Sequence, residues 1–286
     1  MIVNISGYQF IELKDLEQLK EQFLMFCKRI RLLGTVLLSH EGLNVMMAGT
    51  REQIDQFVVW LHQDARFSSL VFKESFSDTI PFKRLRIRIK KEIITLGVDT
   101  VDAVHHVGQH LPPLTFKQWM DEGKDMLVLD TRNDYEVEFG TFKDAINPHI
   151  QSFSQFPAVV DQLDPSLKEK PVVMFCTGGV RCEKASLLME QKGFKHVYQI
   201  EGGILKYFEA CQGAHWEGDC FVFDERVALN PQLQPTGAAQ CYVCGEPVNL
   251  DAQQLPTYIP SVCCPKCVNN KSFDRNRREG VQSESI

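Results

Sequence analysis

The sequence predicts an α/β protein with three parts: an N-terminal α+β sandwich, a central domain with a parallel sheet, and a small cysteine-rich end. Strand-like and helical segments follow a β-α-β-β-α-β order at the start, alternate one by one in the middle, and give way to paired cysteines at the end. A chain of 286 residues also exceeds the usual size of one domain. We expect domains at 1–100, 113–211 and 212–286, with a linker at 101–112.

The segments of the N-terminal part predict a ferredoxin-like (acylphosphatase-like) domain. A strand near Ile2 to Ile11 precedes a helix from about Asp15 to Leu32, and the strand-like runs "TVLLS" and "NVMMAG" follow. A second helix begins at Thr50, which forms a capping box with Gln53. A strand around Leu70 to Glu74 completes the β-α-β-β-α-β order of that fold.

A basic segment closes this domain. In "PFKRLRIRIKKEI" aliphatic residues alternate with four cations, Arg84, Arg86, Arg88 and Lys90. In an extended strand this places the cations together on one face. A solvated face is the commoner meaning of such a run, and an anionic partner is the alternative, because four like charges on one face repel each other. The formal net charge of −6 argues against indiscriminate nucleic-acid binding, but it says nothing about a local basic face such as this RNA-binding candidate.

The central part alternates strands such as "MLVLD", "VVMFC" and "HVYQI" with helices, which predicts a parallel sheet covered on both faces. Sites in such sheets form at the carboxyl ends of the strands. Cys176 ends one strand, and Asp130 and Arg132 end another. We therefore expect these three side chains at the same edge of the sheet.

The run "CTGGVRC" from Cys176 to Cys182 joins a strand to a helix. Backbone N–H groups and the helix dipole at such a turn favour an anion, and Arg181 lowers the pKa of Cys176. This predicts a nucleophile at the base of an anion cradle formed by Thr177, Gly178, Gly179 and Val180. A buried cysteine before a glycine turn is the alternative, and Cys182 is a packing residue or a resolving thiol.

Residues 113–211 resemble a rhodanese domain in "LDTRNDYEVEFGTFKDAINP" and "CTGGVRCEKAS". The resemblance implies that Cys176 carries a persulfide, and that Asp130 and Arg132 brace the loop or bind an anionic group; an ordinary ion pair is the alternative. Four residues separate Cys176 from Arg181, whereas cysteine phosphatases of related fold have five. The shorter loop favours sulfur chemistry over phosphoester chemistry.

Six runs resemble the rhodanese-like tRNA uridine hydroxylases, in the right order: "EGLN", "PFKRLRIRIKKEIITLG", "RNDYEVEFGTF", "CTGGVRCEKAS", "EGGILKYFE" and "CFVFDERVAL". This resemblance implies formation of 5-hydroxyuridine at the wobble position of tRNA, with the anticodon loop as partner and dioxygen as co-substrate. The chain departs from the bacterial pattern at Val45 and Met46, which replace a Gly-Thr turn. No flavin or nicotinamide fingerprint is present, so the sequence identifies no electron or sulfur donor.

Two other functions fit the sequence. A sulfurtransferase that moves sulfane sulfur through a Cys176 persulfide would need the same active-site loop. A non-catalytic RNA-binding protein could keep the rhodanese shape, although the intact Cys176 and Arg181 count against it.

The C-terminal cysteines form two pairs with the spacing of a four-thiolate zinc site: Cys241, Cys244, Cys264 and Cys267. Cys263 is a spare that could replace Cys264, and a chance cysteine-rich tail is the alternative. Zinc would supply much of the folding energy of so small a domain. The segment 269–286 after it is polar and basic, and we expect it to be disordered.

The composition favours a cytoplasmic protein. No apolar stretch is long enough to cross a bilayer, and "MIVNISGYQF" lacks the features of a signal peptide. The chain has ten cysteines but no export signal, so we expect metal binding and thiol chemistry in place of disulfides, and no membrane partner.

Overall fold

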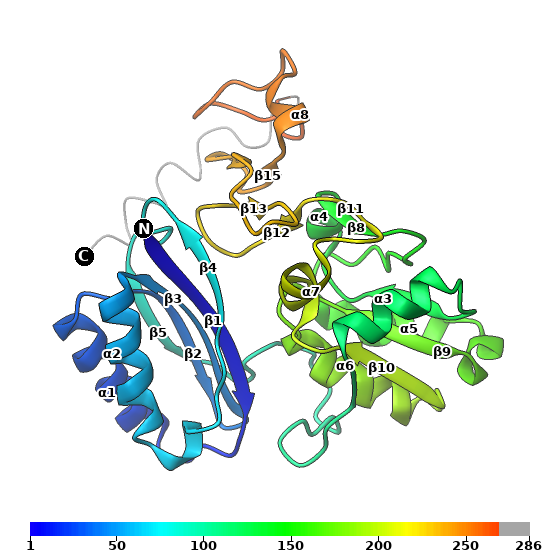
Figure 1. The fold of residues 1–286 in the computed structure, drawn as a ribbon, viewed down its shortest axis with the longest axis horizontal. Helices are drawn as coiled ribbons and strands as arrows, with labels where there is room; N and C mark the ends of the chain where they lie inside the picture. The colour runs from blue at the N-terminus through cyan, green and yellow to red at the C-terminus, as the bar shows by residue number, and fades with distance from the viewer. Residues whose placement is uncertain (269–286) are drawn as a thin grey trace.

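The computed structural model describes residues 1–268, and Figure 1 shows its three parts. The N-terminal part is a five-stranded sheet with strand order β4-β1-β3-β2-β5. Its elements are β1 (Ile2–Phe10), α1 (Leu16–Arg29), β2 (Leu33–Ser39), β3 (Gly42–Gly49), α2 (Arg51–His62), η1 (Ala65–Phe67), β4 (Lys73–Ser77) and β5 (Leu85–Ile89). The predicted element order is confirmed, and so is the capping box of α2. The basic segment adds β5 as an edge strand, parallel to β2.

The strand predicted around Leu70 to Glu74 is wrong in its boundary, because β4 begins only at Lys73. Leu70 instead closes a turn, in which its N–H donates to the carbonyl of Phe67 at 3.0 Å. Both side chains are buried in the core of the domain. The sequence pattern does not distinguish a buried apolar residue in a turn from the first residue of a strand, so the predicted strand began too early.

The two faces of the N-terminal sheet differ in polarity. One face packs against α1 and α2 through buried residues such as Ile5, Val36 and Val45. The opposite face carries Tyr8 and Asn44, which are directly opposite each other on β1 and β3. Figure 1 shows that the helices lie on the side of the sheet away from the central part of the molecule. The polar face is therefore turned toward that part.

The central part has a four-stranded sheet of order β6-β10-β9-β7, in which all strand pairs are parallel. Its elements are β6 (Gln109–Leu111), α3 (Pro113–Asp121), β7 (Leu127–Asp130), α4 (Asp134–Val137), β8 (Gly140–Phe142), η2 (Phe153–Gln155), α5 (Phe156–Gln162), η3 (Pro165–Glu169), β9 (Pro171–Phe175), α6 (Val180–Gln191), β10 (His196–Ile200) and α7 (Gly203–Cys211). Alternate residues of β9 enter two cores: Met174 packs with α5 and α6, and Phe175 packs with α3 and α7. The predicted parallel sheet with helices on both faces is confirmed.

The segment predicted as a linker is partly incorporated into the central domain. Residues Gln109–Leu111 form β6, which pairs with β10. Val101 and Ala103 are buried against the core of the same domain. The prediction of a linker over 101–112 is therefore wrong for residues 109–111, because the three-residue strand is too short to give a pattern in the sequence.

The C-terminal part consists of short strand pairs and one helical turn. Its elements are β11 (Trp216–Gly218), β12 (Cys220–Phe221), β13 (Ala228–Leu229), β14 (Ala239–Gln240), β15 (Pro247–Val248) and α8 (Leu250–Gln253). β11 pairs with β8 of the central domain. Arg226 donates to the hydroxyl of Ser75 on β4 at 2.7 Å, so this part contacts both other domains. Within residues 1–268, no helix combines the length and hydropathy that a membrane span requires.

Buried ion pairs hold the N-terminal sheet against α6. The ammonium of Lys184 is 3% exposed and lies 2.7 Å from carboxylate oxygens of both Glu41 and Glu92. One residue earlier on α6, Glu183 accepts a 2.7 Å hydrogen bond from the hydroxyl of Tyr8. Removing one partner of a buried ion pair is costly, because the other charge is left without compensation. These pairs therefore fix the orientation of the N-terminal sheet over the first turns of α6.

Candidate active site and metal centre

Cys176 follows β9 directly, and its side chain is buried. The N–H of Gly179 donates to its sulfur at 3.1 Å. Gly179 has φ of +100°, a conformation that favours glycine, and a Cβ atom there would lie 2.8 Å from the hydroxyl of Tyr8. The turn therefore requires a glycine both for its backbone and for the close approach of the N-terminal sheet.

The sulfur of Cys176 is stabilised as a thiolate. Burial by itself raises the pKa of this thiol, but the neighbouring thiol of Cys182, the charge of Arg181 and backbone N–H groups lower the pKa more, to below its usual range. The same coupling, with burial as the larger cause, raises the pKa of Cys182. At neutral pH the structure therefore favours a thiolate at Cys176 and a protonated Cys182, which is fully buried.

Arg181 is paired with a carboxylate that the sequence analysis did not identify. Its guanidinium makes a two-point contact with Glu136, at 2.6 Å and 2.7 Å, and both side chains are buried. Glu136 also accepts the N–H of Asn133 at 3.1 Å in the capping box of α4. The sequence signal was present, since Asn followed three residues later by Glu is a capping-box pattern.

Asp130 and Arg132 form a second buried ion pair. Their side chains are fully buried and make contacts of 2.9 Å and 2.6 Å. Arg132 also donates to the carbonyl of Gly140 at 2.6 Å, and Thr141 donates to Asp130 at 2.9 Å. Neither charged residue lines the cavity around Cys176. Of the alternatives from the sequence, this geometry favours a brace for the loop that carries Glu136.

A cavity of about 400 Å³ opens onto Cys176, and all three parts of the chain line it. The cysteine loop contributes Cys176, Thr177, Gly178, Val180 and Arg181. The polar face of the N-terminal sheet and the C-terminal segment supply further residues, among them Tyr8, Asn44, Lys73, Phe223 and Arg226. This volume is within the range of sites that bind small molecules.

Sequence reasoning did not identify the cavity residues outside the rhodanese-like segment. Tyr8 hydrogen bonds to Glu183, which is 175 positions away, and burial raises its pKa above the usual range. Lys73 is the first residue of β4, and its ammonium lies 5.4 Å from the centre of the Tyr8 ring. No local pattern marks either residue, because their role depends on how the domains pack.

The basic strand β5 presents its cations on the polar side of the N-terminal sheet. Arg88 lies opposite Leu37 of β2, which lines the cavity, whereas the intervening Ile87 packs in the core on the helix side. Arg84, Arg86, Arg88 and Lys90 form no ion pair within the described part of the chain. The pKa of Arg86 is lowered, first by burial and then by repulsion from Arg84 and Arg88. The four cations therefore form an unneutralised strip beside the cavity.

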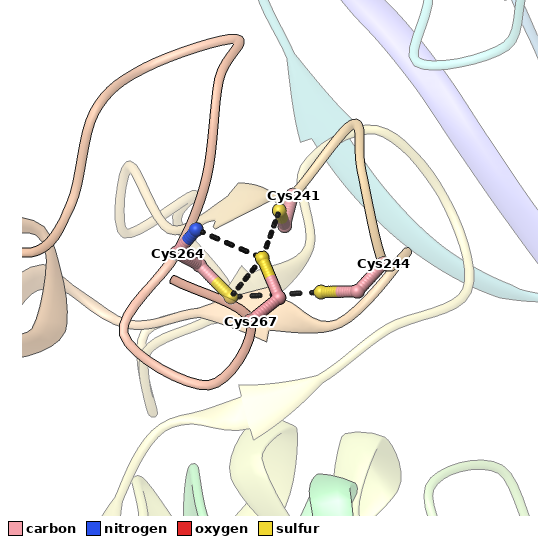
Figure 2. A group of neighbouring side chains, drawn as sticks. All are labelled: Cys241, Cys244, Cys264 and Cys267. Atoms are coloured by element: carbon pink, nitrogen blue, oxygen red, sulfur yellow. Dashed lines mark hydrogen bonds between the residues drawn. The ribbon is translucent and has the colours of Figure 1, made fainter. Parts of the chain in front are cut away.

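Four cysteines converge in the C-terminal part, as Figure 2 shows. The Sγ atoms of Cys241, Cys244, Cys264 and Cys267 all lie within 4.8 Å of one another. The hydrogen-bonded pairs are 3.8, 3.5 and 3.7 Å apart. A tetrahedral zinc with Zn–S bonds of about 2.3 Å places its sulfurs about 3.8 Å apart. The donor set and its dimensions therefore fit a metal ion.

Two neighbours of this cluster are engaged elsewhere. The thiol of Cys263 donates to the carbonyl of Thr257 at 3.6 Å and is not part of the cluster. Lys266 pairs with Glu138 at 2.6 Å and with Glu246 at 3.4 Å, which ties the cluster to the central domain. The tail at 269–286, predicted to be disordered, lies outside the described residues.

Comparisons with known proteins agree along nearly the whole chain. A family model described as "UPF0176 acylphosphatase like domain" matches residues 2–93, and one described as "Rhodanese-like domain" matches residues 113–210. A protein of Cupriavidus pinatubonensis is 47% identical over 272 residues, which cover 93% of this chain and 96% of that protein. A protein of Ralstonia nicotianae is 48% identical over 276 residues, which cover 95% of this chain and 98% of that protein. Both are named tRNA uridine(34) hydroxylase.

Among solved structures, the rhodanese-like domain of an Anabaena protein covers 38% of this chain and 78% of its own, with 22% identity and a TM-score of 0.33.

Proposed function

The chain belongs to the tRNA uridine(34) hydroxylase family, and we propose that it is a cytoplasmic enzyme that converts the wobble uridine of tRNA to 5-hydroxyuridine, with dioxygen as co-substrate. The observation that carries this proposal is the 47% identity to a protein of that name across 93% of the chain. In this proposal Cys176, which lies within the matched residues 113–210, is the catalytic nucleophile.

The geometry of the site supports this reaction. A base must leave its stack before an enzyme can reach its ring atoms, and nucleotides of the anticodon loop are accessible in this way. The cavity of about 400 Å³ is in the size range of small-molecule sites, and Cys176 is one of its lining residues. A thiolate can add to an electron-poor ring carbon, which a neutral thiol does poorly.

Nucleoside mass spectrometry tests the proposal. Purified protein incubated with tRNA, isotopically labelled dioxygen and an added thiol reductant, which supplies the two electrons that reduce the second oxygen atom to water, should yield 5-hydroxyuridine that carries the label at the wobble position. The same incubation without dioxygen should yield none. Unlabelled product, or product formed without dioxygen, would contradict the proposal.

A second candidate function is sulfur transfer, which the thiolate at Cys176 in a rhodanese-like loop favours. Thiolated and hydroxylated uridine have the same nominal mass, so nominal mass alone does not separate them. The isotope label separates the two products, because a thiolated base contains no oxygen from the labelled dioxygen. Thiolation of tRNA would establish the sulfurtransferase in place of the hydroxylase.

We propose that Arg84, Arg86, Arg88 and Lys90 bind tRNA phosphates beside the cavity. Replacing Arg86 and Arg88 by glutamine should weaken tRNA binding at low salt. The slope of log affinity against log salt should fall by roughly one unit for each phosphate that the variant no longer neutralises. A filter-binding titration over a range of salt concentrations measures both quantities.

Lys20→Gln and Lys28→Gln provide the matched control. Both lysines are on α1, which covers the opposite face of the sheet, and the pair removes the same net charge. If the two double variants change affinity and slope equally, β5 is only a solvated edge.

We propose that the metal is zinc and that its role is structural, since four thiolates leave no open position for a substrate. Elemental analysis of protein purified without chelator should give about one zinc per chain. Cys241→Ser should lose the metal, whereas Cys263→Ser should keep it because Cys263 is outside the cluster. Equal zinc content in the two variants would show that these four cysteines are not the ligands.

A further inference from the structure

The charged residues that line the Cys176 cavity are nearly all neutralised by partners. Arg181 pairs with Glu136, and Arg226 pairs with Asp224 at 2.6 Å. Glu74 pairs with Arg51 at 2.8 Å. Within residues 1–268, Lys73 is the one charged lining residue with no oppositely charged group at ion-pair distance.

Close packing directs the Lys73 side chain toward the cysteine loop. A Cβ atom at Gly202 would lie 3.1 Å from Cε of Lys73, and one at Gly203 would lie 2.4 Å from the carbonyl oxygen of Cys176. Both glycines have positive φ values, +70° and +68°. The Gly202–Gly203 turn thus packs against both the Lys73 side chain and the backbone of Cys176, and both residues line the same cavity. These contacts and backbone angles explain why the run "EGGILKYFE" has two consecutive glycines.

The charge balance of the cavity also favours an interaction between these two residues. Arg181 shares its charge with Glu136, so it does not fully neutralise a thiolate at Cys176. Burial lowers the pKa of Lys73, and the charge of Cys176 opposes that shift.

The other charged or titratable groups that face Lys73 are already engaged. Glu183 accepts hydrogen bonds from Tyr8 and Gln199 and lies 3.5 Å from His110, and Glu209 lies 3.6 Å from Lys206. Among the described residues that line the cavity, the carboxylates of Glu74 and Asp224 have their own arginine partners, so a thiolate at Cys176 is the anion without a full counter-charge.

We propose that Lys73 is the counter-ion of the Cys176 thiolate, supplied to the rhodanese loop by the N-terminal domain. This rests on the proposed role of Cys176 as nucleophile, but not on the identity of the substrate. The site is thus assembled across two domains, and a rhodanese domain without the N-terminal sheet lacks this charge. Lys73 would act on any negative charge that forms at the sulfur during the reaction.

Alkylation of Cys176 tests the proposal without tRNA. The full-length protein is treated with neutral iodoacetamide or anionic iodoacetate over a range of pH, and mass spectrometry quantifies the modified Cys176 peptide. Lys73→Met should raise the pH midpoint of iodoacetamide alkylation by roughly one unit, as expected for loss of a nearby opposite charge. It should also lower the ratio of iodoacetate to iodoacetamide rates several-fold, because the cation attracts the anionic reagent.

Two variants complete the test. Lys73→Arg keeps the charge and should retain both the midpoint and the reagent ratio. Lys20→Met removes an equal charge on α1 and should also leave both unchanged. If Lys73→Met behaves like Lys20→Met, the proposal is overturned even if the enzyme hydroxylates tRNA. If Lys73→Met does not fold, Lys73→Gln replaces it and the same criteria apply.

Discussion

Replacing Cys176 by serine is expected to abolish tRNA hydroxylation and to leave the fold intact. A serine hydroxyl is not ionised near neutral pH and cannot carry a persulfide, so the nucleophile is lost. The smaller oxygen fits the same pocket and can still accept the N–H of Gly179. Removal of a catalytic nucleophile should reduce the turnover rate by at least about a thousandfold. The rate of 5-hydroxyuridine formation in purified tRNA measures this.

The control for this variant is Cys211→Ser. Cys211 is the last residue of α7, does not line the cavity and is also buried. Cys211→Ser should keep nearly full activity, and circular dichroism should show both variants folded. A folded Cys176→Ser protein with the activity of the Cys211→Ser control would exclude Cys176 as the nucleophile.

Features encoded by neighbouring residues could be predicted from the sequence. The capping box at Thr50, the glycine turn after Cys176 and the paired C-terminal cysteines each depend on residues a few positions apart. Such patterns need no knowledge of the rest of the fold. The alternation in β5 likewise predicted that Ile87 and the neighbouring arginines face opposite sides of the sheet.

Contacts between domains could not be predicted in this way. Glu41 belongs to "EGLN", Glu92 follows the basic strand and Lys184 belongs to "CTGGVRCEKAS", and the sequence gives no sign that they meet. In the structure both carboxylates lie 2.7 Å from the one ammonium. Residues from these three motifs thus form one ion cluster, which depends on tertiary packing. Tyr8 and Lys73 escaped detection for the same reason.

The structure also changes the expected cost of losing Arg181. The sequence predicts that Arg181→Ala costs less activity than Cys176→Ser, because loop N–H groups remain to stabilise the thiolate. The structure shows that Arg181 also neutralises Glu136, which is fully buried. Removing one member of a buried ion pair leaves an uncompensated charge and typically costs about 3–5 kcal/mol of folding free energy. We therefore expect Arg181→Ala and Glu136→Ala each to destabilise the protein by about that amount.

A double-mutant cycle separates this pairing from other effects. The cycle consists of the wild type, Arg181→Met, Glu136→Gln and the double variant Arg181→Met/Glu136→Gln. The double variant leaves no charge of this pair unpartnered, so it should be more stable than the summed losses of Arg181→Met and Glu136→Gln predict. Urea unfolding of these four proteins gives the coupling free energy.

The ion pair between Lys170 and Asp125 is the matched control, since its atoms are 2.7 Å apart but both side chains are exposed. Its coupling should be below about 1 kcal/mol. Equal coupling in the two pairs would mean that burial of Glu136 does not make Arg181 essential to the fold. The loss of activity in Arg181→Ala would then have to come from the cysteine loop itself.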